Sequence, residues 1–147
     1  MGRYLTRKKW FGKSIKLMNL SVNIAGIKMK NPVTTAAGTF GYGAPFKNFI
    51  DISRLGALLV KGTSLEPWEG NAPHRVVETP SGMLNCIGLQ NYGVEGFISQ
   101  KLPELKKFNI PIIVGVFDKT ADNYARIVER LSKEKGIDGF EANLSCP

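Results

Sequence analysis

Several side chains that could bind a ligand or react follow runs of apolar or small residues in this sequence. Lys61 directly follows the apolar run 57–60. A lysine there can meet an anionic or electron-rich ligand, or simply extend its ammonium group into water. Asn85 offers a donor and an acceptor, which suits a ring with alternating carbonyl and N–H groups, although the pattern alone favours a turn asparagine bonded to its own backbone. Asn143 belongs to a third candidate group, the segment 143–147.

Cys146 is the candidate general base of that third group. A thiol acts as a base only when its pKa is tuned and it is held near the substrate proton, and a lone cysteine is more often an inert thiol. The single histidine, His74, has no partner at a catalytic spacing, which excludes most histidine-dependent nucleophilic schemes within this sequence. No cluster with metal-ligand spacing is present in the sequence, so no metal is expected.

Hydrophobic periodicity and turn residues predict the elements that must position these groups. In order they are a hairpin over 21–29, a short strand over 31–38, a helix over 46–52, a buried strand over 57–62, an irregular segment over 64–93, a helix over 94–108, a buried strand over 110–116, a helix over 120–134 and a strand from 139 to 144. Thr120 is the expected N-cap of the last helix, and Gly136 is placed to end it.

The alternation of strands and helices predicts an α/β fold with about four parallel strands. A complete (β/α)8 TIM barrel takes about 250 residues, so the first four or so β/α units of such a barrel are expected here. The alternative is a small open doubly wound sheet. It would require a glycine-rich phosphate loop after the first strand, and residues 36–43 do not match that pattern.

The net charge of +8 belongs mainly to the first 17 residues, which carry six basic and no acidic side chains. Residues 18–147 hold 14 basic and 12 acidic residues, which argues against a nucleic-acid partner. Residues 1–17 are therefore expected to be a disordered extension of an 18–147 domain. The alternatives are a membrane-surface segment, a targeting peptide, and translation assigned upstream of a true start at Met18. The two cysteines suggest free thiols in a reducing, cytoplasmic setting, and no apolar run is long enough to span a membrane.

Five segments of the sequence resemble the dihydroorotate dehydrogenase family, in order and with family-like spacing. They are 31–43 (NPVTTAAGTFGYG), 60–63 (VKGT), 69–75 (EGNAPHR), 78–91 (ETPSGMLNCIGLQN) and 143–147 (NLSCP). The resemblance is to the amino-terminal half of the NAD-linked class 1B catalytic subunit. It implies an FMN-binding (β/α)8 barrel that oxidises (S)-dihydroorotate to orotate in pyrimidine biosynthesis.

The resemblance also implies a role for each matching residue. Cys146 would take a proton from substrate C5 while hydride leaves C6 for flavin N5. The positions that match flavin contacts are Ala37, Gly38, Lys61, Gly62, Gly115 and Asn143. The positions that match substrate contacts are Lys61, Asn85, Cys86, Ile87, Gly88, Leu89 and Asn143.

Two departures from the family pattern accompany these matches. Gly115 stands where the family usually has an asparagine, and Cys86 replaces a small residue that is usually alanine. By resemblance the full protein is a homodimer within a heterotetramer, paired with an electron-transfer subunit that carries FAD and a 2Fe–2S cluster and reduces NAD. The chain is expected to be a truncated fragment that is inactive alone. The alternatives are a dihydropyrimidine dehydrogenase-like enzyme and a non-catalytic half-barrel that binds a partner.

Overall fold

The computed structural model describes residues 18–144 and residue 146. The extension predicted for residues 1–17 therefore lies outside the described residues. In chain order the main elements are β1 (Val22–Ile24), β2 (Ile27–Met29), β3 (Leu58–Thr63), β4 (Val76–Thr79), β5 (Gly82–Asn85), α1 (Gly93–Gly96), α2 (Leu102–Leu105), β6 (Ile112–Val116), α3 (Ala121–Ser132) and β7 (Gly139–Ala142).

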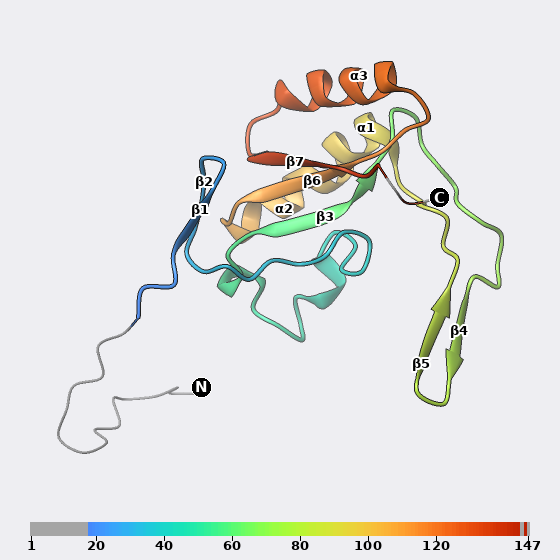
Figure 1. Cartoon of the computed structure of the whole chain (residues 1–147), viewed down its shortest axis with the longest axis horizontal. Coiled ribbons are helices and arrows are strands. Elements are labelled where there is room, and N and C mark those ends of the chain that lie inside the picture. The colour runs from blue at the N-terminus through green and yellow to red at the C-terminus, as the bar shows by residue number, and fades with distance from the viewer. Residues whose placement is uncertain (1–17, 145, 147) are drawn as a thin grey trace.

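A parallel sheet with the strand order β3-β6-β7 forms the centre of the described structure (Figure 1). Val60 lies opposite Val114, and Val114 lies opposite Phe140, so the three strands run in register. The predicted α/β class with a parallel sheet is confirmed. Among the described residues the sheet stays open and does not close into a barrel.

The expected fourth parallel strand, over residues 31–38, is reduced to one bridge between Thr34 and Ala57. A side chain accounts for the difference. The Thr35 hydroxyl donates to the carbonyl of Leu59 at 2.8 Å and accepts from the Leu59 amide at 2.9 Å. This hydroxyl occupies the backbone groups that a ladder would use, so the segment follows the edge of β3 without forming a strand.

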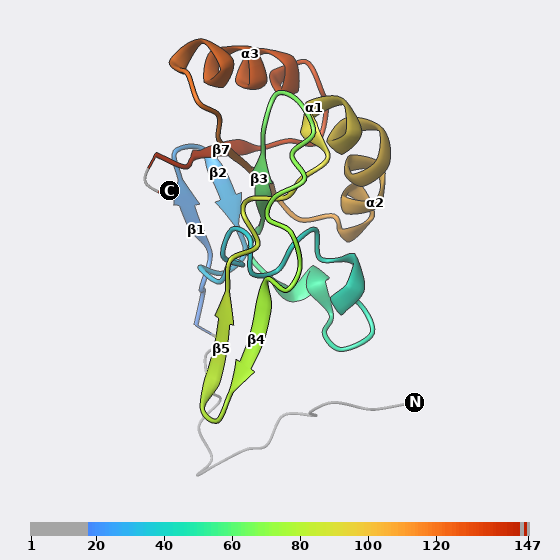
Figure 2. The ribbon, with the colours of Figure 1, turned by 90° about the vertical axis from the view of Figure 1, so that its right-hand side faces the viewer.

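Helices cover one face of this sheet (Figures 1 and 2). The predicted helix over 94–108 is confirmed as one helical segment, in which a π-helical turn, Phe97–Lys101, joins α1 to α2. Pro103 follows that turn and cannot donate a backbone hydrogen bond, which favours a local widening of the helix. The helix predicted over 120–134 is confirmed as α3, with the Thr120 hydroxyl accepting from the Asn123 amide at 3.2 Å.

The hydrophobic core lies between the helices and one face of the sheet. Alternate strand residues point into it, and each such side chain contributes about 1.5–3 kcal/mol by leaving water. The buried members are Ile52, Leu58, Val60, Val94, Phe97, Leu102, Leu105, Ile112, Val114, Val116, Ile127 and Leu131.

The helix predicted over 46–52 is wrong. Two short 3-10 turns, Ala44–Phe46 and Ile52–Arg54, stand in its place. Phe49 is 82% exposed, so the segment has no continuous apolar face to pack against the core. The Asp51 side chain also caps the second turn by accepting from the Ser53 amide at 3.1 Å.

Part of the segment predicted to be irregular, 64–93, forms an antiparallel hairpin of β4 and β5. The hairpin projects from the body of the molecule (Figures 1 and 2). Its turn contains Pro80 and Ser81 between Thr79 and Gly82, a turn signal that was present in the sequence. The prediction missed it because the strands are only four residues long and exposed, with no buried face to impose alternation.

The predicted amino-terminal hairpin is confirmed as β1 and β2. Its turn uses Ala25 and Gly26 at φ 50° and 93°, the positive values that a two-residue hairpin turn requires. Ile27 packs against the start of β7, where a Cβ on Gly139 would lie 2.7 Å from Ile27 Cδ1. The hairpin therefore covers the amino-terminal end of the sheet and leaves the carboxyl edge open.

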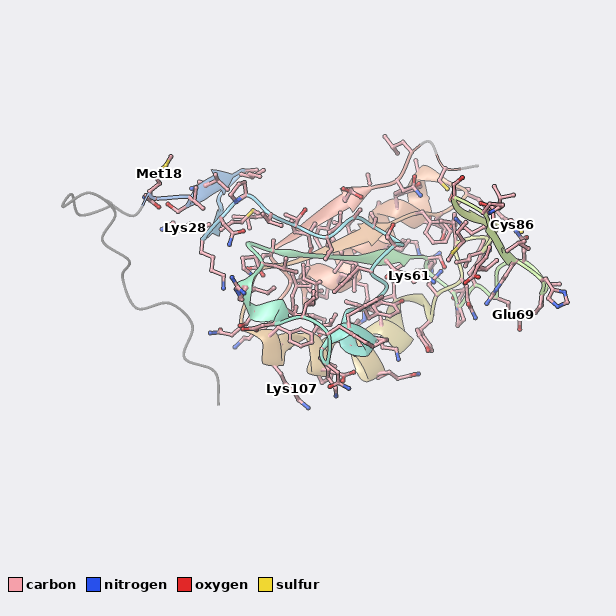
Figure 3. The ribbon with its side chains drawn as sticks, turned by 90° about the horizontal axis from the view of Figure 1, so that it is seen from below. Met18, Lys28, Lys61, Glu69, Cys86 and Lys107 are labelled. Atoms are coloured by element: carbon pink, nitrogen blue, oxygen red, sulfur yellow. The ribbon has the colours of Figure 1, made fainter. Side chains whose placement is uncertain are left out.

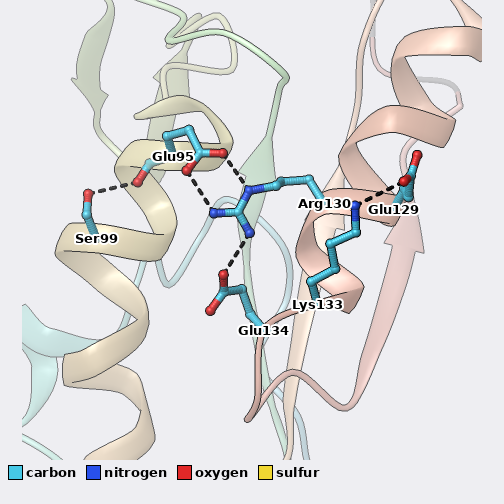
Figure 4. Close-up of polar contacts among 6 residues, drawn as sticks. All are labelled: Glu95, Ser99, Glu129, Arg130, Lys133 and Glu134. Carbon is cyan, nitrogen blue, oxygen red and sulfur yellow. Dashed lines mark hydrogen bonds and ion pairs between the residues drawn. The ribbon is translucent and has the colours of Figure 1, made fainter.

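Arg130 connects α3 to α1 through a bidentate ion pair with Glu95 (Figure 4). Arg130 Nε lies 2.7 Å from Glu95 Oε1, and Nη2 lies 2.9 Å from Oε2. Nη1 of the same guanidinium donates to Glu134 at 2.7 Å. Lys133, by contrast, pairs with Glu129 of its own helix at 3.0 Å.

We expect Arg130→Met to lower the free energy of unfolding more than Lys133→Met does. Both changes remove one positive charge, but only the first disconnects two helices. Urea unfolding of the 147-residue chain, followed by circular dichroism, measures the difference. Added salt should reduce it, and equal effects of the two substitutions would contradict the inter-helix role.

Candidate active site

Lys61, Gly115 and Asn143 follow one another across the three neighbouring strands near the carboxyl edge of the sheet, and we call this set the row. Lys61 lies in β3, Gly115 in β6, and Asn143 follows β7 by one residue. The Asn143 amide donates to the Val116 carbonyl at 2.9 Å, which extends the β6–β7 ladder past the end of β7. Gly115 lies opposite Glu141, so Asn143 lies two residues farther along its strand than Gly115 does.

Ala37 and Gly38 continue this row on the outer side of β3. The Lys61 amide donates to the Gly41 carbonyl at 3.1 Å, which holds the loop after residue 38 against the strand. Gly38 has φ +79°, and a Cβ there would have no heavy atom within 4 Å. Both residues are exposed, so a flat ring can approach their backbone closely.

Lys61 is half-buried in the carboxyl-terminal half of β3, and Figure 3 places it toward the same end of the molecule as Cys86 and Glu69. Burial lowers the pKa of its ammonium group below the ordinary lysine value, and the positive charge of Arg75 lowers it further. No carboxylate in the part of the chain that the structure describes forms an ion pair with Lys61, and a partly desolvated cation of this kind is suited to receive an anion.

A cavity of about 580 Å³ opens beside Lys61. Of the predicted site residues, Gly38 and Lys61 line it, together with the aromatic side chains of Phe40, Tyr42, Phe46, Trp68 and Tyr92. Burial, together with nearby Tyr92, raises the pKa of Tyr42 to about 12, so its hydroxyl stays protonated at neutral pH. The lining does not reach Asn85, Asn143 or Cys146, so the row at the strand edge extends beyond this cavity.

The predicted substrate segment, Asn85–Leu89, runs back from the hairpin toward the strand edge. Asn71 holds its middle: the Asn71 amide donates to the Ile87 carbonyl at 3.1 Å, and Nδ2 donates to the Cys86 carbonyl at 2.7 Å. A Cβ on Gly88 would lie 2.8 Å from the Asn71 nitrogen, so this close approach requires glycine. Asn85 and Cys86 have exposed side chains.

Arg75 fixes the same segment from its other side. Its carbonyl accepts from the Cys86 amide at 2.9 Å. Its guanidinium donates to the carbonyls of Glu69 and Asn71 at 3.2 and 3.0 Å, and to Gln90 Oε1 at 2.5 Å. The sequence prediction missed this role, because an arginine that bonds backbone carbonyls leaves no spacing pattern.

Two glycines at the strand edge stand where a side chain would be tightly packed. A Cβ on Gly115 would lie 3.1 Å from the Val60 carbonyl oxygen and 3.2 Å from Gly62 Cα. The β3–β6 register shifts between Val60 and Thr63, which brings the two backbones together there. This contact is a physical reason for glycine where the family usually has asparagine. A Cβ on Gly62 would itself lie 3.0 Å from the ring of Phe117.

Asn143 and Cys146 are joined by a hydrogen bond after β7. Asn143 Oδ1 accepts from the Cys146 amide at 3.2 Å, and the Tyr124 hydroxyl of α3 donates to the Asn143 carbonyl. Cys146 is exposed and free, as is Cys86. The structure thus places Cys146 at the carboxyl edge, tied to the same asparagine that ends the row.

Asp118 links the loops that follow β3 and β6. Its carboxylate accepts from Asn123 Nδ2 at 2.8 Å, and from the Lys119 and Leu65 amides at 2.7 and 3.1 Å. Although partial burial opposes the shift, these hydrogen bonds hold the pKa of Asp118 below its ordinary value. The loops at the strand edge are therefore fixed by an ionised carboxylate at neutral pH.

Residues 18–144 and 146 contain no group of three histidine, cysteine, aspartate or glutamate side chains arranged to hold a metal. Over the same residues, no helix has both the length and the apolar character needed to cross a membrane.

An open carboxyl edge, a half-buried cation and exposed small residues are typical of α/β proteins that bind a ligand at strand ends. The sequence pattern of the dihydroorotate dehydrogenase family matches residues 19–147, and the chain belongs to that family. Its similarity to dihydroorotate dehydrogenase B (NAD(+)) catalytic subunits confirms the resemblance proposed from the sequence.

Relatives from three bacteria illustrate this similarity. The chain is 53% identical over 129 residues to the subunit of Geobacter sp. (strain M21), covering 88% of this chain and 42% of the relative. It is 50% identical over 133 residues to that of Geobacter metallireducens, covering 90% and 44%. It is 48% identical over 130 residues to that of Thermoanaerobacter sp. (strain X514), covering 88% and 43%. The chain thus spans about two fifths of these relatives and corresponds to their amino-terminal portion.

We expect Lys61→Met to stabilise the 147-residue chain at neutral pH. The folded-state pKa of Lys61 lies below the unfolded value, so the unfolded chain binds more protons between the two values and native stability rises with pH across that window. Below the window the charged lysine costs stability, which methionine removes. The advantage of the variant should therefore shrink as pH rises toward the ordinary lysine pKa.

Urea unfolding as a function of pH measures this effect, with Lys107→Met as the control. Lys107 is exposed and lies away from Lys61 (Figure 3). Lys107→Met therefore removes one positive charge, as Lys61→Met does, but that charge is not buried. A Lys61→Met variant less stable than wild type at neutral pH, or a constant difference at all pH values, would contradict the burial of an uncompensated charge.

Proposed function

We propose that the full protein containing this chain oxidises (S)-dihydroorotate to orotate in the cytoplasm, as a step of pyrimidine biosynthesis. The main support is Lys61, a half-buried cation in the carboxyl-terminal half of the parallel strand β3, where burial lowers its pKa. Close similarity to NAD-linked catalytic subunits supports it over residues 19–147. Because the chain spans about two fifths of those relatives, the activity is proposed for the whole protein, with residues 18–147 as half of its barrel.

FMN fits the open backbone at the carboxyl edge, where nothing lies within 4 Å of the Cβ position of Gly38. When bound, FMN supplies the acceptor for the hydride that leaves substrate C6. Its isoalloxazine ring would be held by residues of neighbouring strand ends. These are Ala37, Gly38, Lys61, Gly62, Gly115 and Asn143.

Lys61 would bind the substrate carboxylate. A charged ligand restores the partner that the partly buried ammonium group lacks, so the pKa of Lys61 should rise when the anion binds. The ring of the substrate would lie along the segment from Asn85 through Cys86, Ile87 and Gly88 to Leu89, whose backbone is held by Asn71 and Arg75. Asn143 would contact the ring from the opposite end of the row.

Cys146 would remove the proton from substrate C5. It is exposed and its backbone is tied to the Asn143 side chain, so the thiol belongs to the same edge as the binding residues. A base on one carbon and a hydride acceptor on its neighbour together produce the double bond of orotate. The proton moves to Sγ as the C5–H bond breaks.

The partners follow from the same proposal. The relatives are called catalytic subunits of an NAD(+) enzyme, which supports a second subunit that passes electrons to NAD. We propose that this subunit carries FAD and a 2Fe–2S cluster, and that two catalytic subunits pair within a heterotetramer. The 147-residue chain alone is expected to be inactive.

We expect Cys146→Ala in the full-length protein to lower kcat by about 10²- to 10⁴-fold, the contribution typical of a positioned general base. Bound FMN, measured by its visible absorbance, should be retained. Cys146→Ser keeps a proton acceptor of similar size but of higher pKa, so its residual activity should rise toward alkaline pH. Unchanged turnover in Cys146→Ala would remove the cysteine as base, and no turnover of dihydroorotate by the wild type would refute the proposed function.

A further inference from the structure

Asn91 is a buried polar residue at the end of the long segment between β3 and α1. Its side chain is among the few polar groups in the described core, with 7% of its surface exposed. Oδ1 accepts from the Ser64 amide at 3.2 Å and from the Gly93 amide at 2.8 Å. Nδ2 donates to Ser64 Oγ at 2.9 Å and to the Leu89 carbonyl at 3.0 Å.

These bonds close the segment at its base. Ser64 directly follows β3, and Gly93 is the first residue of α1, so one side chain joins the exit from the strand to the entry into the helix. The backbone of Asn91 also pairs with that of Trp68. The Asn91 amide donates to the Trp68 carbonyl at 2.8 Å, and the Trp68 amide donates to the Asn91 carbonyl at 3.1 Å. The Ser64 hydroxyl donates onward to the Glu66 carbonyl at 2.7 Å, which leaves its oxygen free to accept from Nδ2.

The bond to Leu89 has a distinct consequence. Leu89 has φ +57°, a left-handed conformation that a leucine rarely adopts without an external constraint. Leu89 is also the last residue of the segment proposed to bind substrate. The Asn91 side chain binds the Leu89 carbonyl and, at the same time, Ser64. Ser64 lies only three residues after Lys61 in the chain.

We propose that Asn91 is a positioning residue that sets the distance between Lys61 and the substrate segment Asn85–Leu89. The inference rests on the proposed function, because it concerns the distance between two parts of that binding site, Lys61 and the substrate segment. Without the hydrogen bond from Asn91 to its carbonyl, Leu89 could leave its left-handed backbone conformation. The segment would then move relative to the ammonium group without disturbing the flavin-facing residues Ala37 and Gly38.

Two substitutions in the full-length protein separate the bond to Leu89, which we call the tether, from the bonds to Ser64 and Gly93, which close the segment at its base. Asn91→Ala removes all four side-chain bonds. Asn91→Asp keeps acceptors for the Ser64 and Gly93 amides, but an ionised carboxylate cannot donate to the Leu89 carbonyl. Ile127→Val is the control, because it trims a fully buried side chain of α3, away from the segment, at a cost of about 1 kcal/mol.

We expect both Asn91 variants to raise the KM for dihydroorotate by about tenfold, with kcat and bound FMN changed by less than about twofold. Hydrogen–deuterium exchange of the amides over residues 85–90 should become faster in both. Ile127→Val should leave the KM and that exchange unchanged. An unchanged KM, a fall in kcat at unchanged KM, or an equal rise of KM in Ile127→Val would overturn the proposal.

The exchange measurement also distinguishes this inference from the proposed function. If the wild type does not oxidise dihydroorotate, the assigned reaction fails, whereas faster exchange over 85–90 in the Asn91 variants still supports the tether. Unchanged exchange in both variants overturns the tether whatever the substrate is. Should Asn91→Ala not fold, the comparison rests on Asn91→Asp.

Discussion

The parallel pairing of β3, β6 and β7 is the constraint on which the rest of the structure depends. Because the three strands run in one direction, their carboxyl ends meet at one edge, and residues far apart in sequence become neighbours there. Helices cover one face, and the β1–β2 hairpin covers the amino-terminal end, so the carboxyl edge is left for a ligand. The site is therefore a consequence of strand direction before it is a consequence of any single side chain.

Loop fixation is the second requirement, since strand ends alone do not define a pocket. Three polar side chains hold the loops at this edge: Asn91 closes the segment after β3, Asp118 joins the loops after β3 and β6, and Arg75 binds the carbonyls around the substrate segment. Each uses several hydrogen bonds to backbone groups, which satisfies polar atoms that would otherwise be costly to bury. Lys61 is half-buried and forms no ion pair with a carboxylate among residues 18–144 and 146.

Strong apolar periodicity made much of this fold predictable. The strands at 57–62 and 110–116 and the helix at 120–134 followed from buried runs and an N-cap, and all three are present. The prediction of a strand at 31–38 was wrong because hydrogen bonds from the Thr35 side chain replace backbone pairing there. The hairpin within 64–93 was not predicted because its strands have no buried face. The sequence also pointed to Lys61, whereas Asn91 and Arg75 emerged only from the structure, because bonds to carbonyl groups leave no periodic signal.

The structure of the full-length protein in complex with orotate tests the central claim most directly. We predict that the orotate carboxylate lies against the Lys61 ammonium group, its ring along residues 85–89, and its C5 nearest to the Cys146 sulfur. We expect the flavin ring to lie against Ala37 and Gly38. Orotate bound elsewhere, or bound here with its carboxylate turned away from Lys61, would contradict the assignment of the carboxyl edge as the site of dihydroorotate oxidation.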